Sequence, residues 1–148
     1  MRIWMAFLVS LPLLACSVPA SLGQTNENLA EDLFEQGQAA FRGGEPDSAI
    51  ALYTEAIGAD PNYAAAYVGR GGVYAVLKDY EAAIADFDQA IELDPELASA
   101  YGSRGVARYR SGDPEGIRDL WQAARLFRDQ DRMEDYFKTL VIIRRLDP

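Results

Sequence analysis

A repeat of 34 residues constrains this chain more than any other feature of its sequence. Shifting the sequence by 34 positions places Gly37 on Gly71, and Gly71 on Gly105. Further matches under the same shift are Leu33, Tyr67 and Tyr101; Ala30, Ala64 and Ala98; Tyr53 and Phe87; Asp60-Pro61 and Asp94-Pro95. A repeat of this length holds one small structural unit that cannot bury its apolar face alone, so the copies are expected to stack.

The second copy has the pattern of two antiparallel helices. Tyr67, Gly71 and Tyr74 recur at spacings of three and four, which places them on one face of a helix. A second run with the same spacing follows after a short turn at residues 78–80. It ends before Pro95, because a proline disfavours helical geometry in the residue that precedes it. The unit is therefore predicted to be a helical hairpin.

The third copy aligns with the second only if one residue is deleted after Glu115. The aligned pairs are then Ala83 with Gly116, Asp86 with Asp119, and Phe87 with Leu120. This alignment predicts a tighter turn in the third hairpin. It also moves Trp121 away from the contact between the two helices, and we expect its side chain to lie beneath the last helix.

The order of aromatic, glycine, aromatic, alanine, aromatic, alanine and proline in each copy resembles the tetratricopeptide repeat family. The resemblance implies an all-α solenoid of three helix-turn-helix repeats, at about residues 30–63, 64–97 and 98–130. The predicted domain spans residues 29–148. Its last segment, residues 131–147, carries an apolar stripe with helical spacing and is predicted to be a capping helix that covers the third repeat.

Two pairs of opposite charges recur at equivalent positions of the second and third copies. Arg70 and Arg104 each precede the shared glycine, and Asp86 and Asp119 each precede the aromatic or leucine residue of the second helix. The first copy lacks both members, with Gln36 and Leu52 in their places. Because the charges are present or absent together, we predict a structural ion pair across each of the two hairpins.

The resemblance also implies where a partner would bind. In tetratricopeptide repeat proteins, the first helices of successive hairpins line a concave groove for a peptide or a helix of another protein. The positions that this geometry assigns to the groove are Phe34, Gln38, Phe41, Val68, Gly72, Ala75, Val106, Tyr109 and Arg110. Family members that bind chaperones hold a terminal carboxylate there with lysines and asparagines. The corresponding residues of this chain are Phe34, Gln38, Gly69, Ser99 and Ser103, so a carboxylate clamp of that type is not expected.

The first 15 residues resemble a secretory signal, with Arg2 followed by an apolar run too short to cross a bilayer. The run ends at Cys16, the sole cysteine, in a Leu-Leu-Ala-Cys sequence that resembles the lipobox of bacterial lipoproteins. Lipidation at Cys16 would anchor the exported protein to a membrane of the cell envelope. Cleavage after Ala20 is the alternative, and it would release a soluble periplasmic or secreted protein. Residues 16–28 are predicted to be a flexible tether.

The composition argues against several classes of function. The chain contains no histidine, which removes the usual nucleophile systems and common zinc sites, and we expect neither enzymatic activity nor a metal or cofactor. A net charge of −9 disfavours binding to nucleic acid. Two functions remain. One is an adaptor or scaffold of the bacterial cell envelope that binds another protein, and the other is a structural protein that associates with itself and has no free groove.

Overall fold

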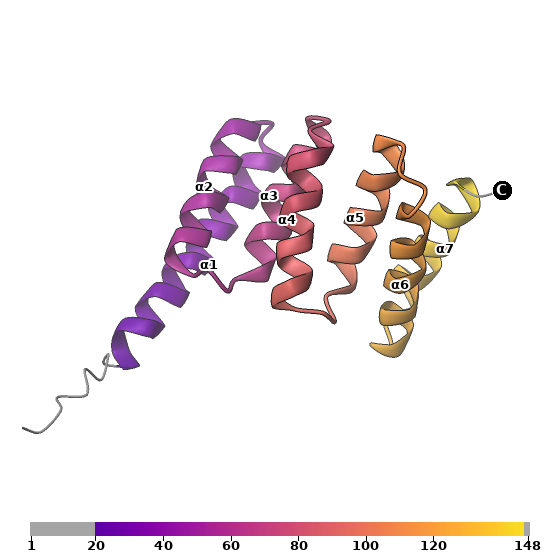
Figure 1. Cartoon of the computed structure of the whole chain (residues 1–148). Helices are drawn as coiled ribbons and strands as arrows, with labels where there is room; N and C mark the ends of the chain where they lie inside the picture. Colours follow the sequence, from indigo (N-terminus) through magenta and orange to yellow (C-terminus); the bar gives the residue numbers. More distant parts are fainter. Residues whose placement is uncertain (1–19, 147–148) are drawn as a thin grey trace, which may run out of the picture.

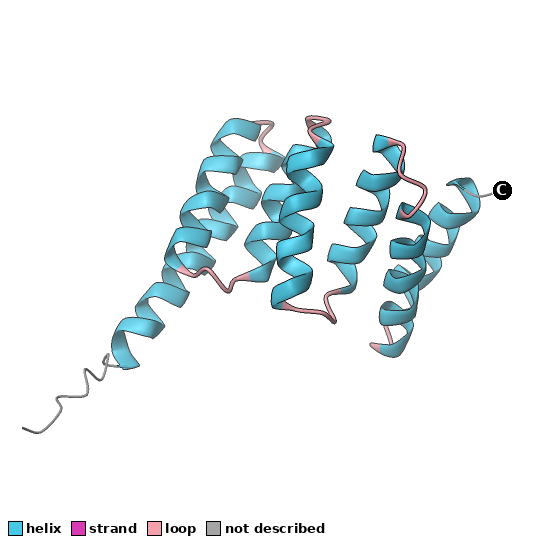
Figure 2. Ribbon diagram, in the orientation of Figure 1, coloured by secondary structure: helices cyan, strands magenta, loops and turns pink. Residues whose placement is uncertain are grey.

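The computed structural model describes residues 20–146, and these residues form α-helices joined by short turns, with no strand (Figures 1 and 2). The helices are α1 (Ala20–Arg42), α2 (Pro46–Ala59), α3 (Ala64–Val76), α4 (Tyr80–Leu93), α5 (Ala98–Ser111), α6 (Gly116–Asp129) and α7 (Met133–Leu146). The first six form three antiparallel hairpins that stack side by side, and α7 packs against α6 at the end of the stack. The predicted solenoid of three repeats and a capping helix is confirmed.

The core of each hairpin packs a small residue of one helix against a large residue of the other. At Gly71, a β-carbon would come within 2.9 Å of the Phe87 ring, and Phe87 is itself almost fully buried. In the first hairpin, Gly37 lies equally close to the ring of Tyr53. The repeated glycines therefore allow the two helices of each hairpin to approach closely.

The turn inside each hairpin contains one residue with a left-handed backbone. These residues are Gly44 (φ 80°), Lys78 (φ 65°) and Gly112 (φ 92°), and they are 34 residues apart. After the turn, Asp79 caps α4 by accepting a hydrogen bond of 3.1 Å from the amide of Ala82. The second hairpin thus has a lysine where its neighbours have glycine, the residue that best tolerates a left-handed backbone.

The contacts between the helices of the third hairpin confirm the alignment with one residue deleted, but the predicted tighter turn was wrong, because residues 112–115 join α5 to α6, whereas residues 77–79 join α3 to α4. The two helices of the third hairpin approach so closely that a β-carbon at Gly116 would collide with the carbonyl oxygen of Gly105. Leu120 is buried at the position of Phe87, as predicted. The expectation for Trp121 was wrong, since its side chain is 49% exposed. The reason is geometric, because Trp121 follows buried Leu120 directly, and adjacent residues on a helix face in different directions.

The predictions for the amino-terminal segment can be compared with the structure only from residue 20 onward. The signal segment and Cys16 lie outside the described residues, while residues 20–28, which were expected to belong to a flexible tether, continue α1. That correction follows from the sequence, since Pro19 is followed by no further proline before Pro46, and the helix can extend back to Ala20. No helix within residues 20–146 is long and apolar enough to cross a membrane.

Candidate peptide-binding groove

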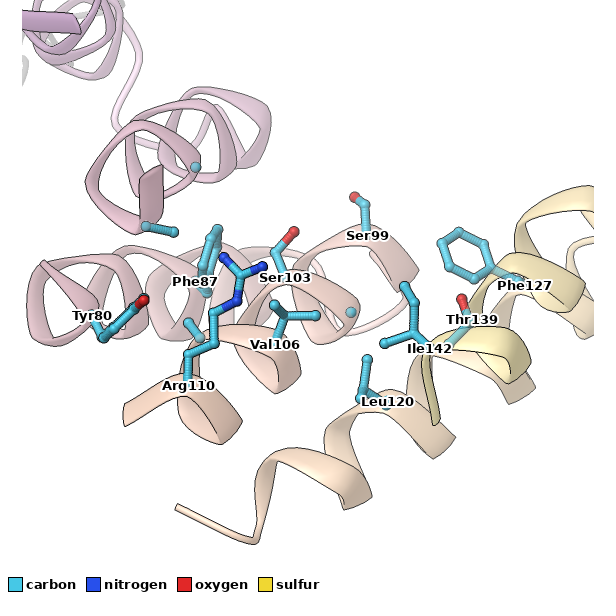
Figure 3. Close-up of a pocket in the computed structure, with 14 residues that line it drawn as sticks. Tyr80, Phe87, Ser99, Ser103, Val106, Arg110, Leu120, Phe127, Thr139 and Ile142 are labelled. Atoms are coloured by element: carbon cyan, nitrogen blue, oxygen red, sulfur yellow. The ribbon is translucent and has the colours of Figure 1, made fainter. Parts of the chain in front are cut away.

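A pocket of about 430 Å³ opens on the face of the solenoid formed by α3, α5 and α7 (Figure 3). Buried side chains of α4 and α6 contribute to its walls. The lining residues are Gly72, Ala75, Tyr80, Phe87, Ser99, Gly102, Ser103, Val106, Ala107, Arg110, Leu120, Phe127, Thr139 and Ile142. Most of these are apolar or small, so the pocket is suited to an apolar side chain or to one face of a helix.

Small residues create the space in this pocket. A β-carbon at Gly72 would meet no atom within 4 Å, and one at Gly102 would meet only the methyl group of Ala123, at 3.6 Å. These glycines are therefore not needed for helix packing, in contrast to Gly71 and Gly105. Their effect is to leave α3 and α5 without side chains at the places where a ligand would lie.

The polar groups of the pocket are few and come mainly from α5. Arg110 is the only charged residue that lines it, and Ser99 and Ser103 supply hydroxyl groups. In Figure 3, the guanidinium group of Arg110 extends toward Ser103. Within residues 20–146, Arg110 forms no ion pair, which leaves its charge available to a ligand. Arg110 is exposed at the edge of the apolar pocket, and an unpaired guanidinium group there favours a carboxylate or a carbonyl group of a ligand.

Four of the predicted groove residues line the pocket: Gly72, Ala75, Val106 and Arg110. Tyr109 lies in an adjoining hollow, where its hydroxyl group donates a hydrogen bond of 3.1 Å to the carbonyl oxygen of Leu146. Two of the three predicted α5 residues therefore line the pocket, while the third, Tyr109, holds the end of α7.

The other predicted groove residues lie elsewhere. The ring of Phe34 packs against Tyr53 and Tyr63, at centroid distances of 5.6 and 5.3 Å. Phe41 packs on the core of the first two repeats, and Val68 packs on the core of the second and third. Gln38 lines a separate polar hollow with Asp32, Glu35, Gln36, Ala39 and Arg42. The first repeat has more aromatic residues than its neighbours at these positions, and they pack on the core that the first and second repeats share.

Sequence reasoning missed the contribution of the last helix. Thr139 and Ile142 of α7 line the pocket, although α7 was expected only to cap the third repeat. The repeat itself could not identify them, because steps of 34 residues from Ser103 and Val106 lead to Phe137 and Leu140 instead. The α7 helix is thus displaced in register relative to the other first helices.

Both predicted ion pairs are present, and both are bidentate. The Nε and Nη2 atoms of Arg70 donate to Asp86 over 2.9 and 2.7 Å, and those of Arg104 donate to Asp119 over 2.8 and 2.7 Å. Asp86 and Asp119 are buried, with 7% exposure each. This paired geometry matches the planar fork of arginine to the two carboxylate oxygens and fixes the angle between the helices of each hairpin.

Each arginine also reaches the preceding repeat. The Nη1 atom of Arg70 donates to the hydroxyl oxygen of Thr54 over 3.0 Å, and that of Arg104 donates to a carboxylate oxygen of Asp88 over 2.5 Å. Thr54 and Asp88 occupy equivalent positions of α2 and α4. The hydrogen bond with Asp86 raises the pKa of Arg70 despite burial. Burial opposes the charge of Arg104, but its hydrogen bonds to the two aspartates outweigh that effect and raise its pKa. Both guanidinium groups thus stay charged.

The described residues contain no cluster of three or more side chains suited to hold a metal ion. The helical hairpins and the spacing of their glycines are those of a helical repeat protein. The model of the tetratricopeptide repeat family matches residues 34–98 and 79–131, and the chain belongs to this family. No curated protein matches the sequence.

Solved structures support the same assignment. The tetratricopeptide repeat domain of Arabidopsis OM64 is 26% identical, with a TM-score of 0.71 over 81% of this chain and 98% of that one. The second such domain of Spaghetti (RPAP3), bound to the HSP90 peptide SRMEEVD, is 32% identical, with a TM-score of 0.66 over 70% and 96% of the two chains. The TPR2B domain of yeast Sti1, in complex with an Hsp70 peptide, is 26% identical, with a TM-score of 0.67 over 76% and 96%.

Proposed function

We propose that this protein is an adaptor whose groove binds an apolar segment of another protein, either a helix or an extended peptide. The observation that carries the proposal is the pocket between α3, α5 and α7, where glycine and alanine leave room above an apolar base. A helix or peptide that places apolar side chains in this space would bury them against Val106 and Ile142. Arg110 would meet one carboxylate or carbonyl group of the same ligand.

The chemistry of the ligand should differ from that of the peptides bound by the similar structures. The HSP90 peptide SRMEEVD carries two glutamates and an aspartate. The pocket of this protein offers a single cation, and the clamp positions Ser99 and Ser103 are neutral. A strongly acidic peptide would also be repelled by a chain of net charge −9. We therefore infer that the ligand is mainly apolar and carries at most one acidic group near Arg110.

A library of displayed peptides tests this proposal directly, because selection can begin before any partner has been identified. Selection on the wild-type protein should enrich apolar sequences with one acidic residue. Val106→Asp should abolish the enrichment, because it places a charge in the apolar wall. Val76→Asp is the matched control, since Val76 lies on the same kind of helix and is 64% exposed. Enrichment of polyacidic peptides, or equal enrichment by the Val106→Asp variant, would contradict the proposed groove.

Arg110→Glu provides a second test in the same library. Reversing the charge should replace the acidic residue of the selected peptides by lysine or arginine, while the apolar positions stay the same. Arg118→Glu is the matched control, because Arg118 lies outside the pocket, with an exposed side chain. An unchanged preference in the Arg110→Glu variant would remove this residue from the binding site.

We further propose that the adaptor acts in the bacterial cell envelope and is anchored by a lipid on Cys16. The support is the lipobox-like sequence at the end of the apolar run. Mass spectrometry of the mature amino terminus tests the anchor. A diacylglyceryl cysteine at the first position is the expected result, and a mature chain that begins at Ser21 would establish the alternative cleavage and a soluble exported protein.

The alternative of a self-associating structural protein predicts a different outcome in the library. If a second copy filled the groove, selection would succeed only at protein concentrations low enough to dissociate the copies. Binding of the selected peptides that is independent of protein concentration would support the adaptor.

A further inference from the structure

The face of α7 that points away from the solenoid carries exposed apolar side chains beside charged ones. Tyr136, Thr139 and Ile143 lie on the inner face, where Tyr136 packs on the core and the other two are buried. Phe137 and Val141 lie on the outer face, with 57% and 50% of their surfaces exposed. A helix that ends a solenoid normally turns a polar face to water, and the exposed Phe137 and Val141 of α7 depart from that rule.

The exposed side chains of Phe137 and Val141 form one apolar strip along α7. Phe137 and Val141 are four residues apart and therefore lie above one another on the helix surface. With Glu134, Lys138 and Ile142 they line a shallow hollow on this face, and Met133 extends the apolar surface toward the start of the helix. Exposed apolar surface that is contiguous and bordered by charges marks a site of association. We call the surface formed by this strip and the flanking charged residues, Glu134 and Arg144, the outer face of α7.

The charges of α7 indicate what covers this face. Acidic residues lie in the first turn, at Glu134 and Asp135, and basic residues lie in the last turn, at Arg144 and Arg145. Neither arginine has an ion pair within residues 20–146, whereas Glu134 pairs with Lys138 and Asp135 with Arg132 at the exposed surface of the same chain. A second α7 that runs in the opposite direction brings its basic end to the acidic end of the first. The helix is therefore complementary to itself in the antiparallel orientation, and a parallel pair would place like charges together.

One register satisfies the apolar and the charged residues together. Consider a twofold axis that crosses the outer face of α7 at the level of residue 139. Residue 137 then faces residue 141 of the second copy, and residue 134 faces residue 144. Phe137 thus meets Val141 and Glu134 meets Arg144, twice in each pair of molecules. Self-complementary contacts of this kind define a closed dimer with twofold symmetry.

We propose that the outer face of α7 is a self-association site, at which two copies of this chain pair through antiparallel α7 helices. The groove stays open in such a dimer, because Phe137 and Val141 lie outside it and only Ile142 borders both surfaces. The dimer presents two grooves and can bind two ligand segments at once. One face of a helix of about 20 Å buries less area than a standard interface, so the dissociation constant is expected in the micromolar range.

Sedimentation of the full chain in mild detergent tests the proposal, over concentrations from about 1 to about 300 µM. The wild type should show a monomer–dimer equilibrium. Phe137→Asp should weaken association at least tenfold, and it should not disturb the fold because Phe137 is exposed. Val76→Asp, at an exposed apolar position of α3, should leave association unchanged. A wild type that stays monomeric over the whole range, or a dimer that Phe137→Asp does not weaken, would overturn the proposal.

Charge exchange tests the antiparallel register directly. Glu134→Arg and Arg144→Glu should each weaken the homodimer, because each places like charges opposite one another. A mixture of the two variants should form a heterodimer, since every facing pair is then of opposite sign. The double variant should associate as the wild type does. Failure of the mixture to associate, with both variants folded by circular dichroism, would show that the α7 helices do not pair in this way.

Discussion

The bidentate pair of Arg70 and Asp86 should be strongly coupled in a double-mutant cycle. Asp86 is buried, and its hydrogen bonds come from Arg70 alone among those found in residues 20–146. Arg70→Ala would strand that carboxylate, which should cost about 3 kcal/mol, the lower end of the range for breaking a buried pair. Asp86→Ala should cost about 2 kcal/mol, because Arg70 keeps Thr54 and has 20% of its side chain exposed.

The double variant should cost much less than the sum of these two losses. Removing both charges leaves no buried group without a partner, so we expect about 2 kcal/mol in place of about 5 kcal/mol, and a coupling energy of about 3 kcal/mol. Urea unfolding followed by circular dichroism supplies the four free energies of unfolding. Additive losses, within about 0.5 kcal/mol, would refute the proposed dependence of each charge on the other.

The third repeat supplies an internal control for this reasoning. Asp119 accepts two bonds from Arg104, but it also accepts a bond of 3.0 Å from the Nη1 atom of Arg108. Arg104→Ala therefore leaves the carboxylate with a cation, and the coupling of Arg104 with Asp119 should fall to about 1 kcal/mol. A coupling as large as that of the second repeat would mean that burial of the carboxylate, and not loss of its partner, determines the cost.

Three further changes test the backbone, the groove and the core. Lys78→Gly should stabilise the fold by up to about 1 kcal/mol in urea unfolding, because φ is 65° at this position. A loss of stability would mean that the lysine side chain has a role of its own. Gly72→Ala should also stabilise α3, by about 1 kcal/mol, since its β-carbon meets no atom within 4 Å, but it should weaken peptide binding by narrowing the groove. Unchanged binding would place the ligand away from α3. Tyr53→Phe should lessen the loss of stability above about pH 10, because burial raises the pKa of Tyr53 even though the charge of Arg42 lowers it. In the wild type the unfolded phenol ionises first, so stability falls as the pH rises toward the folded pKa. An identical alkaline profile in the variant would contradict this.

The fold and the ion pairs were predictable because the three copies of the repeat can be compared with one another. Three copies of one unit show which positions change together. The first copy has neutral residues, Gln36 and Leu52, at both positions, and this was enough to pair Arg70 with Asp86. The match of Asp119 with Asp86 and of Leu120 with Phe87 likewise identified the one-residue deletion in the third copy. Such inferences need only that equivalent positions have equivalent neighbours, which holds in a regular stack.

The groove was only partly predictable because its ends are irregular. Gly72 and Val106 lie in the two most regular first helices, and both line the pocket. Phe34 does not line it, since a large ring can turn toward the core, and the choice depends on packing with Tyr53 and Tyr63 that spacing does not reveal. The contribution of Ile142 could not be read from the repeat, because a step of 34 residues from Val106 leads to Leu140.

The reach of each arginine into the preceding repeat makes the two junctions of the solenoid unequal. Arg70 joins the first and second repeats through the neutral hydroxyl group of Thr54, and Arg104 joins the second and third through the carboxylate of Asp88. A charged acceptor holds a guanidinium group more strongly than a neutral one. Bending should therefore concentrate between α2 and α3, with the first hairpin swinging as a unit. The two walls of the groove, α3 and α5, stand on the stiffer junction, so the binding surface keeps its shape while the end of the molecule nearest the amino terminus moves.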